Sequence, residues 1–390
     1  MPICDAFEFE CPVKIHYGDR ALEHLPFELH ALDATKPLVI GDAPAGAEKR
    51  LTPVLNAFRD TQMTLGVVED VVFDPMDAVV SQLAAIYRDK DCDAIVAVGQ
   101  GPCADAAKWL NLVVSTGQET LLPFTGEQQV PRISKPLALI PSASADGFEV
   151  SGHLRSREVS LRSVNLMPQL VFVDFRACGQ PDEEVMTETT LMALTHAVEA
   201  FFRADGNPMT SVYARTAARL AASALHQLAG RGHPHDRLNL TVAHAAALGG
   251  CALGSHRPGD ACQLGAAVAE SGRVSAAQAT GIVLSYLLEH RAAKGALDAD
   301  ALLGLLGGID RYTRTPEGQR GAAALYLLRD LMNQLFEKTD GRIYRTLQDT
   351  GLTPAEMKKA AGRVAAQAMA SDPVVYETIL AHAWAGRPFA

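Results

Sequence analysis

Short runs of β-branched and aliphatic residues alternate with longer stretches of helical periodicity over the first 180 residues. The runs lie at 37–41, 65–68, 94–99, 137–141 and 170–174, and the helical stretches lie between them at 45–59, 76–89 and 103–115. This alternation is typical of parallel strands, because the chain must cross back over the sheet before the next parallel strand can form. It predicts an α/β N-terminal domain over residues 1–180.

The pattern changes after Asp182, where Ala, Leu and Thr dominate and strand-like runs almost disappear. Helical periodicity continues at 187–203, 208–229, 240–255 and 274–293. A chain of 390 residues is long enough for two domains that each bury a core. We therefore predict an all-α C-terminal domain over residues 181–390.

The charge balance opposes some classes of partner. The formal net charge is −10 and the pI is near 5.6, so no net attraction draws nucleic acid phosphates or an anionic membrane surface. We expect a small-molecule substrate, and neither a nucleic acid nor a membrane as a partner.

The cysteines and the first residues bear on the location of the protein. The seven cysteines are scattered, odd in number and without paired zinc spacings, and the acidic start lacks a continuous apolar stretch. These features indicate a cytoplasmic protein with reduced thiols.

A glycine-containing turn follows the strand expected at 94–99. Glycine lets a phosphate approach the backbone closely, and the free amides at a helix start face its negative charge. Because the spacing differs from G-x-G-x-x-G, a tight strand-to-helix connection remains an equal alternative. The turn and the helical stretch after it supply six candidate cofactor contacts, which are Gly99, Gln100, Gly101, Pro102, Asp105 and Lys108.

The segment 140–151 carries small hydroxyl residues after another expected strand, at the edge where α/β sheets bind ligands. Ser142, Ser144 and Phe148 are candidate cofactor contacts in it, and Asp146 is a candidate catalytic residue. The alternative is a Ser-rich loop whose side chains bond their own backbone.

The expected helix at 187–203 carries His196 and Glu199, three residues apart. Histidine is the side chain most often used for proton transfer, because its ordinary pKa lies near neutrality. The alternative is that His196 is a buried polar residue satisfied by its neighbours.

Taken in this order, the segments resemble the iron-containing (group III) alcohol dehydrogenase family, including its maleylacetate reductase-like branch. The resemblance runs from residues 13–19 to residues 347–354, and the family's G-G-G-S-x-x-D-x-A-K corresponds to residues 99–108. The family's P-T-T-A-G-T-G-S-E-V-T corresponds to residues 141–151. The resemblance to this family implies a dehydroquinate synthase-like fold, in which a dinucleotide-binding α/β domain precedes an all-α domain.

The resemblance also implies roles for single residues. The glycine turn would cradle the pyrophosphate of the dinucleotide, and Asp105 would lie near the nicotinamide ribose. Pro102 stands where the family has Ser, so one hydroxyl and one backbone donor are missing, although Pro fits the first turn of a helix. Asp146 stands where Thr is usual, and the pattern Ser144-Ala-Asp-Gly147 also looks like the glycerol-1-phosphate dehydrogenase branch.

Asp42 follows the first strand of the expected dinucleotide fold, where the family often has Asp near the adenosine ribose. A carboxylate there would accept hydrogen bonds from a free 2′-hydroxyl and repel a 2′-phosphate. NAD is therefore favoured and NADP is left open. An aspartate that caps a turn is an equal alternative.

The resemblance implies a site for Fe²⁺ or Zn²⁺ made by an Asp and a His four apart on one helix, followed by two later His. The His corresponds to His196, but the Asp position holds Met192. A thioether offers no anionic oxygen to a hard cation.

The later ligands also change. An alignment on the Gln-Leu-Gly at 263–265 puts Pro258 and Cys262 at two His positions, whereas a small shift would bring in His256 and Asp260. No histidine occurs from 257 to 289. Since three protein ligands are the usual minimum for a catalytic zinc site, we expect no catalytic metal. If a metal did bind, His196 and His256 would be the weak candidates for its ligands.

Without a metal, His196 would polarise a carbonyl as a proton donor, which suits the reduction of an activated ketone. His153, Arg155 and Arg157 follow the Ser-rich loop and would face an anionic substrate, although such arginines are more often on a solvated hairpin.

The leading hypothesis is an NAD(P)-dependent oxidoreductase that interconverts a small alcohol and an aldehyde, ketone or keto acid without a catalytic metal. The alternative is a non-catalytic or regulatory dinucleotide-binding homologue, and a lyase or cyclase ranks third. From the resemblance we also expect a homodimer.

Overall fold

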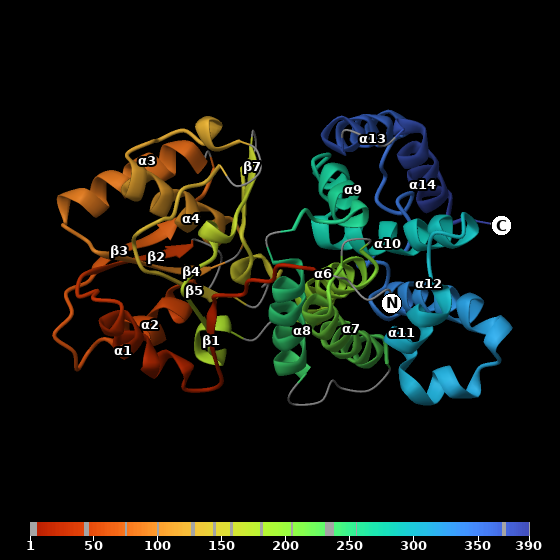
Figure 1. Ribbon diagram of the computed structural model, residues 1–390, viewed down its shortest axis with the longest axis horizontal. Coiled ribbons are helices and arrows are strands. Elements are labelled where there is room, and N and C mark those ends of the chain that lie inside the picture. The colour runs from red at the N-terminus through yellow and green to blue at the C-terminus, as the bar shows by residue number, and fades with distance from the viewer. Residues whose placement is uncertain are drawn as a thin grey trace. The chain divides into compact units, whose positions relative to one another are not determined.

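The computed structural model describes residues 6–42, 47–74, 76–99, 101–125, 129–142, 146–156, 159–179, 182–203, 206–230, 238–254, 256–368 and 372–389. The chain divides into two compact units. The sheet unit comprises residues 10–181 and 254–257, and the helical unit comprises residues 1–9, 182–253 and 258–390. Figure 1 shows the sheet in the first unit and helices throughout the second. The predicted fold class, an α/β part followed by an all-α part, is confirmed.

The sheet unit contains a six-stranded parallel sheet with the strand order β1-β8-β5-β4-β2-β3. Its strands are β1 (Lys14–Tyr17), β2 (Pro37–Asp42), β3 (Gly66–Val71), β4 (Ala94–Gly99), β5 (Leu137–Pro141) and β8 (Leu170–Val173). Val96 on β4 pairs with Val39 on β2 and with Ala138 on β5. Every residue of β2, β4, β5 and β8 is buried, which is why these strands appear in the sequence as continuous apolar runs.

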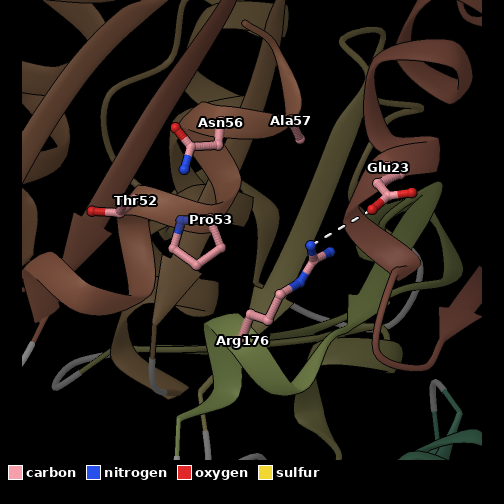
Figure 2. Close-up of a pocket in the computed structure, with 6 residues that line it drawn as sticks. All are labelled: Glu23, Thr52, Pro53, Asn56, Ala57 and Arg176. Carbon is pink, nitrogen blue, oxygen red and sulfur yellow. Dashed lines mark ion pairs between the residues drawn. The ribbon is translucent and has the colours of Figure 1, made fainter.

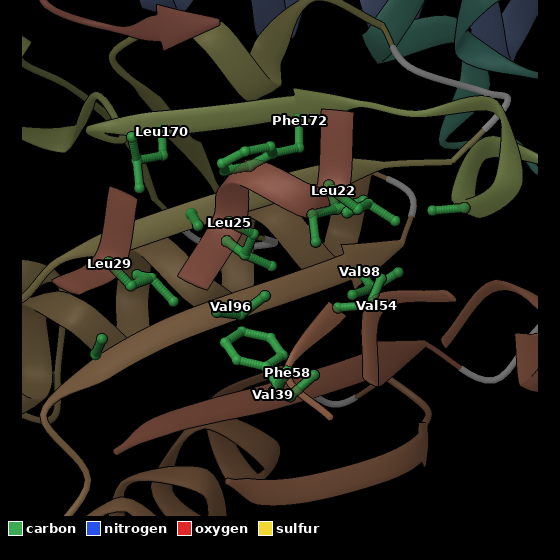
Figure 3. Close-up of a cluster of buried hydrophobic side chains, with 14 of the residues drawn as sticks. Leu22, Leu25, Leu29, Val39, Val54, Phe58, Val96, Val98, Leu170 and Phe172 are labelled. Atoms are coloured by element: carbon green, nitrogen blue, oxygen red, sulfur yellow. The ribbon is translucent and has the colours of Figure 1, made fainter. Parts of the chain in front are cut away.

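Helices cover both faces of this sheet (Figure 1). They are α1 (Leu25–Ala31) and α2 (Ala47–Ala57) on one face, and α3 (Met76–Asp89) and α4 (Gly101–Thr116) on the other, with the short α5 (Phe175–Cys178) after β8. Figure 3 shows the core under the first face, where Leu25 and Leu29 of α1 and Phe58 after α2 pack over Val96 and Phe172 of the strands. This core and the buried strands fix the carboxyl edge of the sheet.

The helical unit is built from nine helices of eight or more residues among the described residues. They are α6 (Glu183–Phe201), α7 (Pro208–Ala229), α8 (Leu238–Leu253), α9 (Asp260–Ala269), α10 (Ala276–Ala293), α11 (Ala299–Arg314), α12 (Arg320–Lys338), α13 (Pro354–Ala368) and α14 (Pro373–Ala385). Asp182 caps α6, since its carboxylate accepts a hydrogen bond from the amide of Val185. α6 packs against α7, α8, α9 and α10, so most of its side chains are buried.

Some elements were not expected from the sequence. α1 is too short to give a periodic pattern. The antiparallel hairpin of β6 (His153–Arg155) and β7 (Ser160–Arg162) agrees with the alternative that the sequence left open for the arginines after the Ser-rich loop. No helix among the described residues is both long and apolar enough to cross a membrane.

Candidate cofactor and catalytic site

The glycine turn lies where β4 ends and α4 begins. Gly99 is the last residue of β4 and Gly101 the first of α4, while Gln100 lies outside the described residues. A Cβ atom on Gly99 would lie 2.5 Å from the carboxyl carbon of Asp42, so only glycine fits beside that carboxylate. Pro102 is exposed in the first turn of α4, where a missing amide hydrogen costs no helical hydrogen bond.

Asp42 ends β2 next to this turn and is buried, with 7% of its surface exposed. Its Oδ1 atom lies 3.3 Å from Nη2 of Arg50 on α2, and this ion pair is itself mostly shielded from solvent. A small hollow beside the pair is also lined by Glu69 and Asp70 of β3. Three carboxylates and one guanidinium therefore surround the end of β2.

Lys108 is completely buried on α4, and its ammonium binds the backbone that precedes and begins β6. Its Nζ atom donates hydrogen bonds to the carbonyl oxygens of Phe148, Ser151 and His153 at 2.7 to 2.8 Å. Burial lowers the pKa of Lys108 to about 8, against the opposing charge of Asp105. Because an ammonium has three donors and all three are used here, Lys108 positions this backbone; the direct cofactor contact expected from the sequence does not fit this geometry.

Asp105 and Asp146 hold one arginine between them. The amide and the Nε atom of Arg155 donate to the two carboxylate oxygens of Asp105 at 3.0 Å, and Nη1 lies 3.2 Å from Oδ2 of Asp146. The guanidinium also lies 3.8 Å from the ring centre of the buried Phe148. Burial raises the pKa of Asp105, and the charge of Arg155 opposes that shift. The structure thus brings Asp105, Asp146 and Phe148 together around Arg155, although the sequence indicated each of them separately.

Glu149 is a buried carboxyl group beside this network, and it lies in the segment 141–151 without having been a candidate site residue. Its Oε2 atom accepts a hydrogen bond from the amide of Gly147, which has a φ of 88°. Burial and the neighbouring charge of Asp146 raise the pKa of Glu149 to about 7. Ser142 is also buried, and its amide donates to the carbonyl of Gly99, whereas Ser144 lies outside the described residues.

His196 lies in the helical unit, buried on α6. Its Nε2 atom lies 3.6 Å from Sγ of Cys262, which is in the first turn of α9 and is also buried. The alignment on residues 263–265 placed Cys262 at a ligand position of the same expected site as His196, and the two side chains do lie together although 66 residues separate them.

Glu199, one turn after His196, caps the start of α9. Its Oε1 atom accepts a hydrogen bond of 2.7 Å from the amide of Ala261, and a Cβ atom on Gly259 would collide with its carboxylate. Burial raises the pKa of Glu199 to about 7. This contact fixes α9, and hence Cys262, against α6.

A separate hollow of about 470 Å³ lies on α2 beside α5 (Figure 2). Arg176 and Glu23 face each other across it at 3.7 Å, and Arg176 also binds the buried Asp174 at 2.7 Å. Its charged groups are thus held by one another, and none of the candidate residues lines it.

Comparisons with known proteins agree with this geometry. The "Iron-containing alcohol dehydrogenase" domain pattern matches residues 12–175, and the "Fe-containing alcohol dehydrogenase family, C-terminal" pattern matches residues 186–377. The chain belongs to the iron-containing alcohol dehydrogenase family. The expected enzyme class, an NAD-dependent oxidoreductase of alcohols and carbonyl compounds, is confirmed at the level of this family.

Individual family members are distant in sequence. A choline dehydrogenase of Bacillus subtilis (strain 168) is 23% identical over 355 residues, covering 89% of this chain and 86% of the relative. The fold matches a 1,3-propanediol oxidoreductase with a TM-score of 0.85 at 20% identity, over 97% of this chain and 100% of that structure. A maleylacetate reductase from Rhizobium sp. strain MTP-10005 gives a TM-score of 0.74 at 22% identity, over 99% and 100%.

The metal of the iron-containing alcohol dehydrogenase family does not fit the residues present. Met192 is buried one turn before His196, and Cys262 rather than a histidine faces the imidazole. Asp260 is held by Arg291 at 2.7 Å and by the hydroxyl of Tyr376 at 3.0 Å. No three His, Cys, Asp or Glu side chains of the described residues gather into a group that could hold a metal ion.

The other weak candidate for a metal ligand is His256. His256 comes two residues after Gly254, whose carbonyl accepts a hydrogen bond from the amide of Gly152. His256, Gly254 and Gly152 all belong to the sheet unit. His196 belongs to the helical unit.

Proposed function

We propose that this chain is an NAD-dependent oxidoreductase that reduces a small aldehyde, ketone or keto acid, or oxidises the corresponding alcohol, without a catalytic metal. The observation that carries the proposal is that Gly99 ends β4 and Gly101 begins α4 at the carboxyl edge of the sheet, beside a small hollow and a carboxylate that ends the adjacent strand. A helix that starts directly after a strand at this edge of a parallel sheet suits the binding of a diphosphate.

The chain's own residues have distinct tasks in this proposal. The start of α4 at Gly101 receives the diphosphate, Gly99 lets Asp42 lie beside the turn, and Asp42 accepts hydrogen bonds from the adenosine ribose. Lys108 keeps the backbone before β6 in place, so that the residues over the glycine turn hold one geometry. A nicotinamide dinucleotide, when bound, supplies or accepts the hydride.

We assign proton transfer to His196. In the reducing direction its imidazole donates a proton to the carbonyl oxygen, and in the oxidising direction it accepts the alcohol proton. Cys262 lies 3.6 Å from Nε2 and is the group that can share a proton with that nitrogen. Because the described residues around His196 do not supply the three ligands that a catalytic metal ordinarily needs, no step of this scheme uses a metal.

Asp146 was expected to be catalytic, and its ion pair with Arg155 favours a positioning task instead. Arg155, which the sequence offered as a contact for an anionic substrate, is bound by Asp105 and Asp146 at the start of α4. The homodimer and the cytoplasmic location also remain proposals.

A titration of NADH and NADPH into chelator-treated protein, followed by nucleotide fluorescence, tests the proposed function. Binding of NADH that is unchanged by added Fe²⁺ or Zn²⁺, with turnover of a carbonyl substrate, supports it. Binding of neither nucleotide would overturn it.

A second function is favoured by one observation. The buried thioether of Met192 and the thiol of Cys262 lie where a metal-dependent member needs oxygen and nitrogen ligands. A regulatory protein that only binds the dinucleotide would tolerate this change. Tight NADH binding with no turnover across a broad panel of aldehydes and keto acids would favour this second function.

A further inference from the structure

The glycine turn has lost a donor that a diphosphate site ordinarily uses. Pro102 has no amide hydrogen, so the start of α4 offers one backbone donor fewer to an anion. The helix itself is 16 residues long, and its N-terminal end still attracts negative charge. A cation next to the turn would compensate for the missing donor.

Arg155 lies at that place. Its Nη2 atom would be 3.0 Å from a Cβ atom built on Gly101, so the guanidinium lies against the first residue of α4. Its side chain is 35% exposed, whereas that of its partner Asp105 is 6% exposed. The arginine is therefore anchored on its buried side and accessible on the other.

The anchoring of Arg155 is unusually complete for a partly exposed arginine. Asp105 binds both its amide and its Nε atom, and Phe148 lies under the plane of the guanidinium. Lys108 in turn binds the carbonyl of Phe148. Because the side chain is ordered before any ligand arrives, little conformational entropy is lost when an anion binds to it.

Asp146 lies at the same position. Its Oδ2 atom would be 3.3 Å from the Cβ atom built on Gly101, and it lies 3.2 Å from Nη1 of Arg155. A carboxylate oxygen thus occupies the start of α4 beside the arginine. An oxygen of a diphosphate has the same charge and the same acceptor geometry toward a guanidinium.

We propose that Arg155 is the cation that binds the diphosphate of the dinucleotide, and that the carboxylate of Asp146 occupies part of this place until the diphosphate displaces it. The inference rests on the proposed function and specifies a residue of that same site. Asp105 keeps its contacts with Arg155 in both states, so only the Asp146 contact is exchanged. Asp146 then lowers the affinity for the dinucleotide, while Arg155 raises it.

The test measures the dissociation constant of NADH by fluorescence for the wild-type protein and for Arg155→Ala, Arg155→Lys and Asp146→Asn. Loss of charged hydrogen bonds should weaken binding by about 10-fold to 100-fold in Arg155→Ala. Arg155→Lys keeps the charge but not the planar fork, so it should weaken binding less. Asp146→Asn should bind NADH more tightly than the wild type, because it removes a competing and repelling charge. Arg59→Ala, an exposed arginine of the same unit, is the matched control for the change in net charge.

The sign of the Asp146→Asn effect separates this proposal from a purely structural one. If the Arg155–Asp146 pair only stabilised the fold, both variants would weaken binding and both would lower the melting temperature of the free protein. Weaker or unchanged binding in Asp146→Asn, or unchanged binding in Arg155→Ala, would overturn the inference while leaving the proposed function intact. If the wild type itself binds no NADH, both fail together.

Discussion

The Sγ atom of Cys262 lies 3.6 Å from the Nε2 atom of His196, and both side chains are buried. In the iron-containing alcohol dehydrogenase family the corresponding histidine holds a metal, but here its imidazole faces a thiol and follows Met192 by one helical turn. The thioether of Met192 offers no anionic oxygen to such a metal ion. The role that we propose for His196 is accordingly proton transfer.

Replacing His196 should separate binding from turnover. In His196→Ala the proton donor is lost, so we expect turnover to fall about 100-fold or more, the scale of general acid catalysis. The dissociation constant for NADH should stay nearly unchanged, because the glycine turn is intact. Steady-state kinetics and a fluorescence titration measure the two quantities. His226→Ala, at an exposed histidine on α7, is the control. An equal loss of binding and turnover in His196→Ala would argue against the assigned role.

Removal of metal should leave the protein unaffected. We expect extensive treatment with a chelator to change neither the turnover nor the NADH affinity, since the residues around His196 lack the ligands for a hard cation. Metal content by mass spectrometry and activity before and after dialysis check this expectation. Activity that disappears with the chelator and returns only with Fe²⁺ or Zn²⁺ would show that the protein holds a catalytic metal through ligands other than His196 and Cys262 alone.

Lys108 should be essential for stability rather than for direct cofactor contact. Lys108→Met leaves three buried carbonyl oxygens without their donor, so the free energy of unfolding should fall by about 3 kcal/mol or more. Urea denaturation followed by circular dichroism measures the change. Lys90→Met, at an exposed lysine of the same unit, should lie within about 0.5 kcal/mol of the wild type. A stable Lys108→Met protein that has lost only its NADH affinity would contradict this role.

Glu199 should make stability depend on pH. Burial raises its pKa from the ordinary 4.5 to about 7, so the folded protein binds more protons than the unfolded chain between these values. The contribution of Glu199 to the free energy of unfolding is therefore complete below about pH 4.5 and is lost as the pH rises through 7, by roughly 2 to 3 kcal/mol. Denaturation curves from pH 5 to 8 measure it.

Glu199→Gln should flatten that pH dependence, because the amide does not titrate but still accepts a hydrogen bond from Ala261. Glu337→Gln, at an exposed glutamate on α12, should leave it unchanged. A slope that persists in Glu199→Gln would assign the dependence to another group, of which Glu149 is the first candidate.

The sequence predicted the elements of this fold better than the contacts of its site. Periodicity is local, so the buried strand β4 and the amphipathic helix α3 could be recognised from their own residues. The contact between Asp105 and Arg155 spans 50 residues and depends on how β6 meets α4, which no local pattern contains. The acceptors of Lys108 are backbone carbonyls, and every residue has one. Its positioning role was for that reason invisible in the sequence.

Cofactor preference should depend on Asp42 and Arg50 together. The carboxylate of Asp42 repels a 2′-phosphate, and it also holds Arg50, whose Nη2 atom lies 3.3 Å away. Nε of Arg50 has no hydrogen-bond partner within the described part of the chain, so the guanidinium has donors to offer once Asp42 is removed. Asp42→Ser should therefore raise the affinity for NADPH relative to NADH by about 10-fold to 100-fold.

The double variant Asp42→Ser with Arg50→Ala identifies the source of that gain. If Arg50 binds the 2′-phosphate, the double variant should lose most of the new NADPH affinity while keeping that for NADH, because NADH carries only a hydroxyl at this position. Fluorescence titrations of both nucleotides give the ratio directly. If the ratio in Asp42→Ser equals that of the wild type, Asp42 does not face the ribose, and the preference for NAD must come from the other carboxylates at this edge, Glu69 and Asp70.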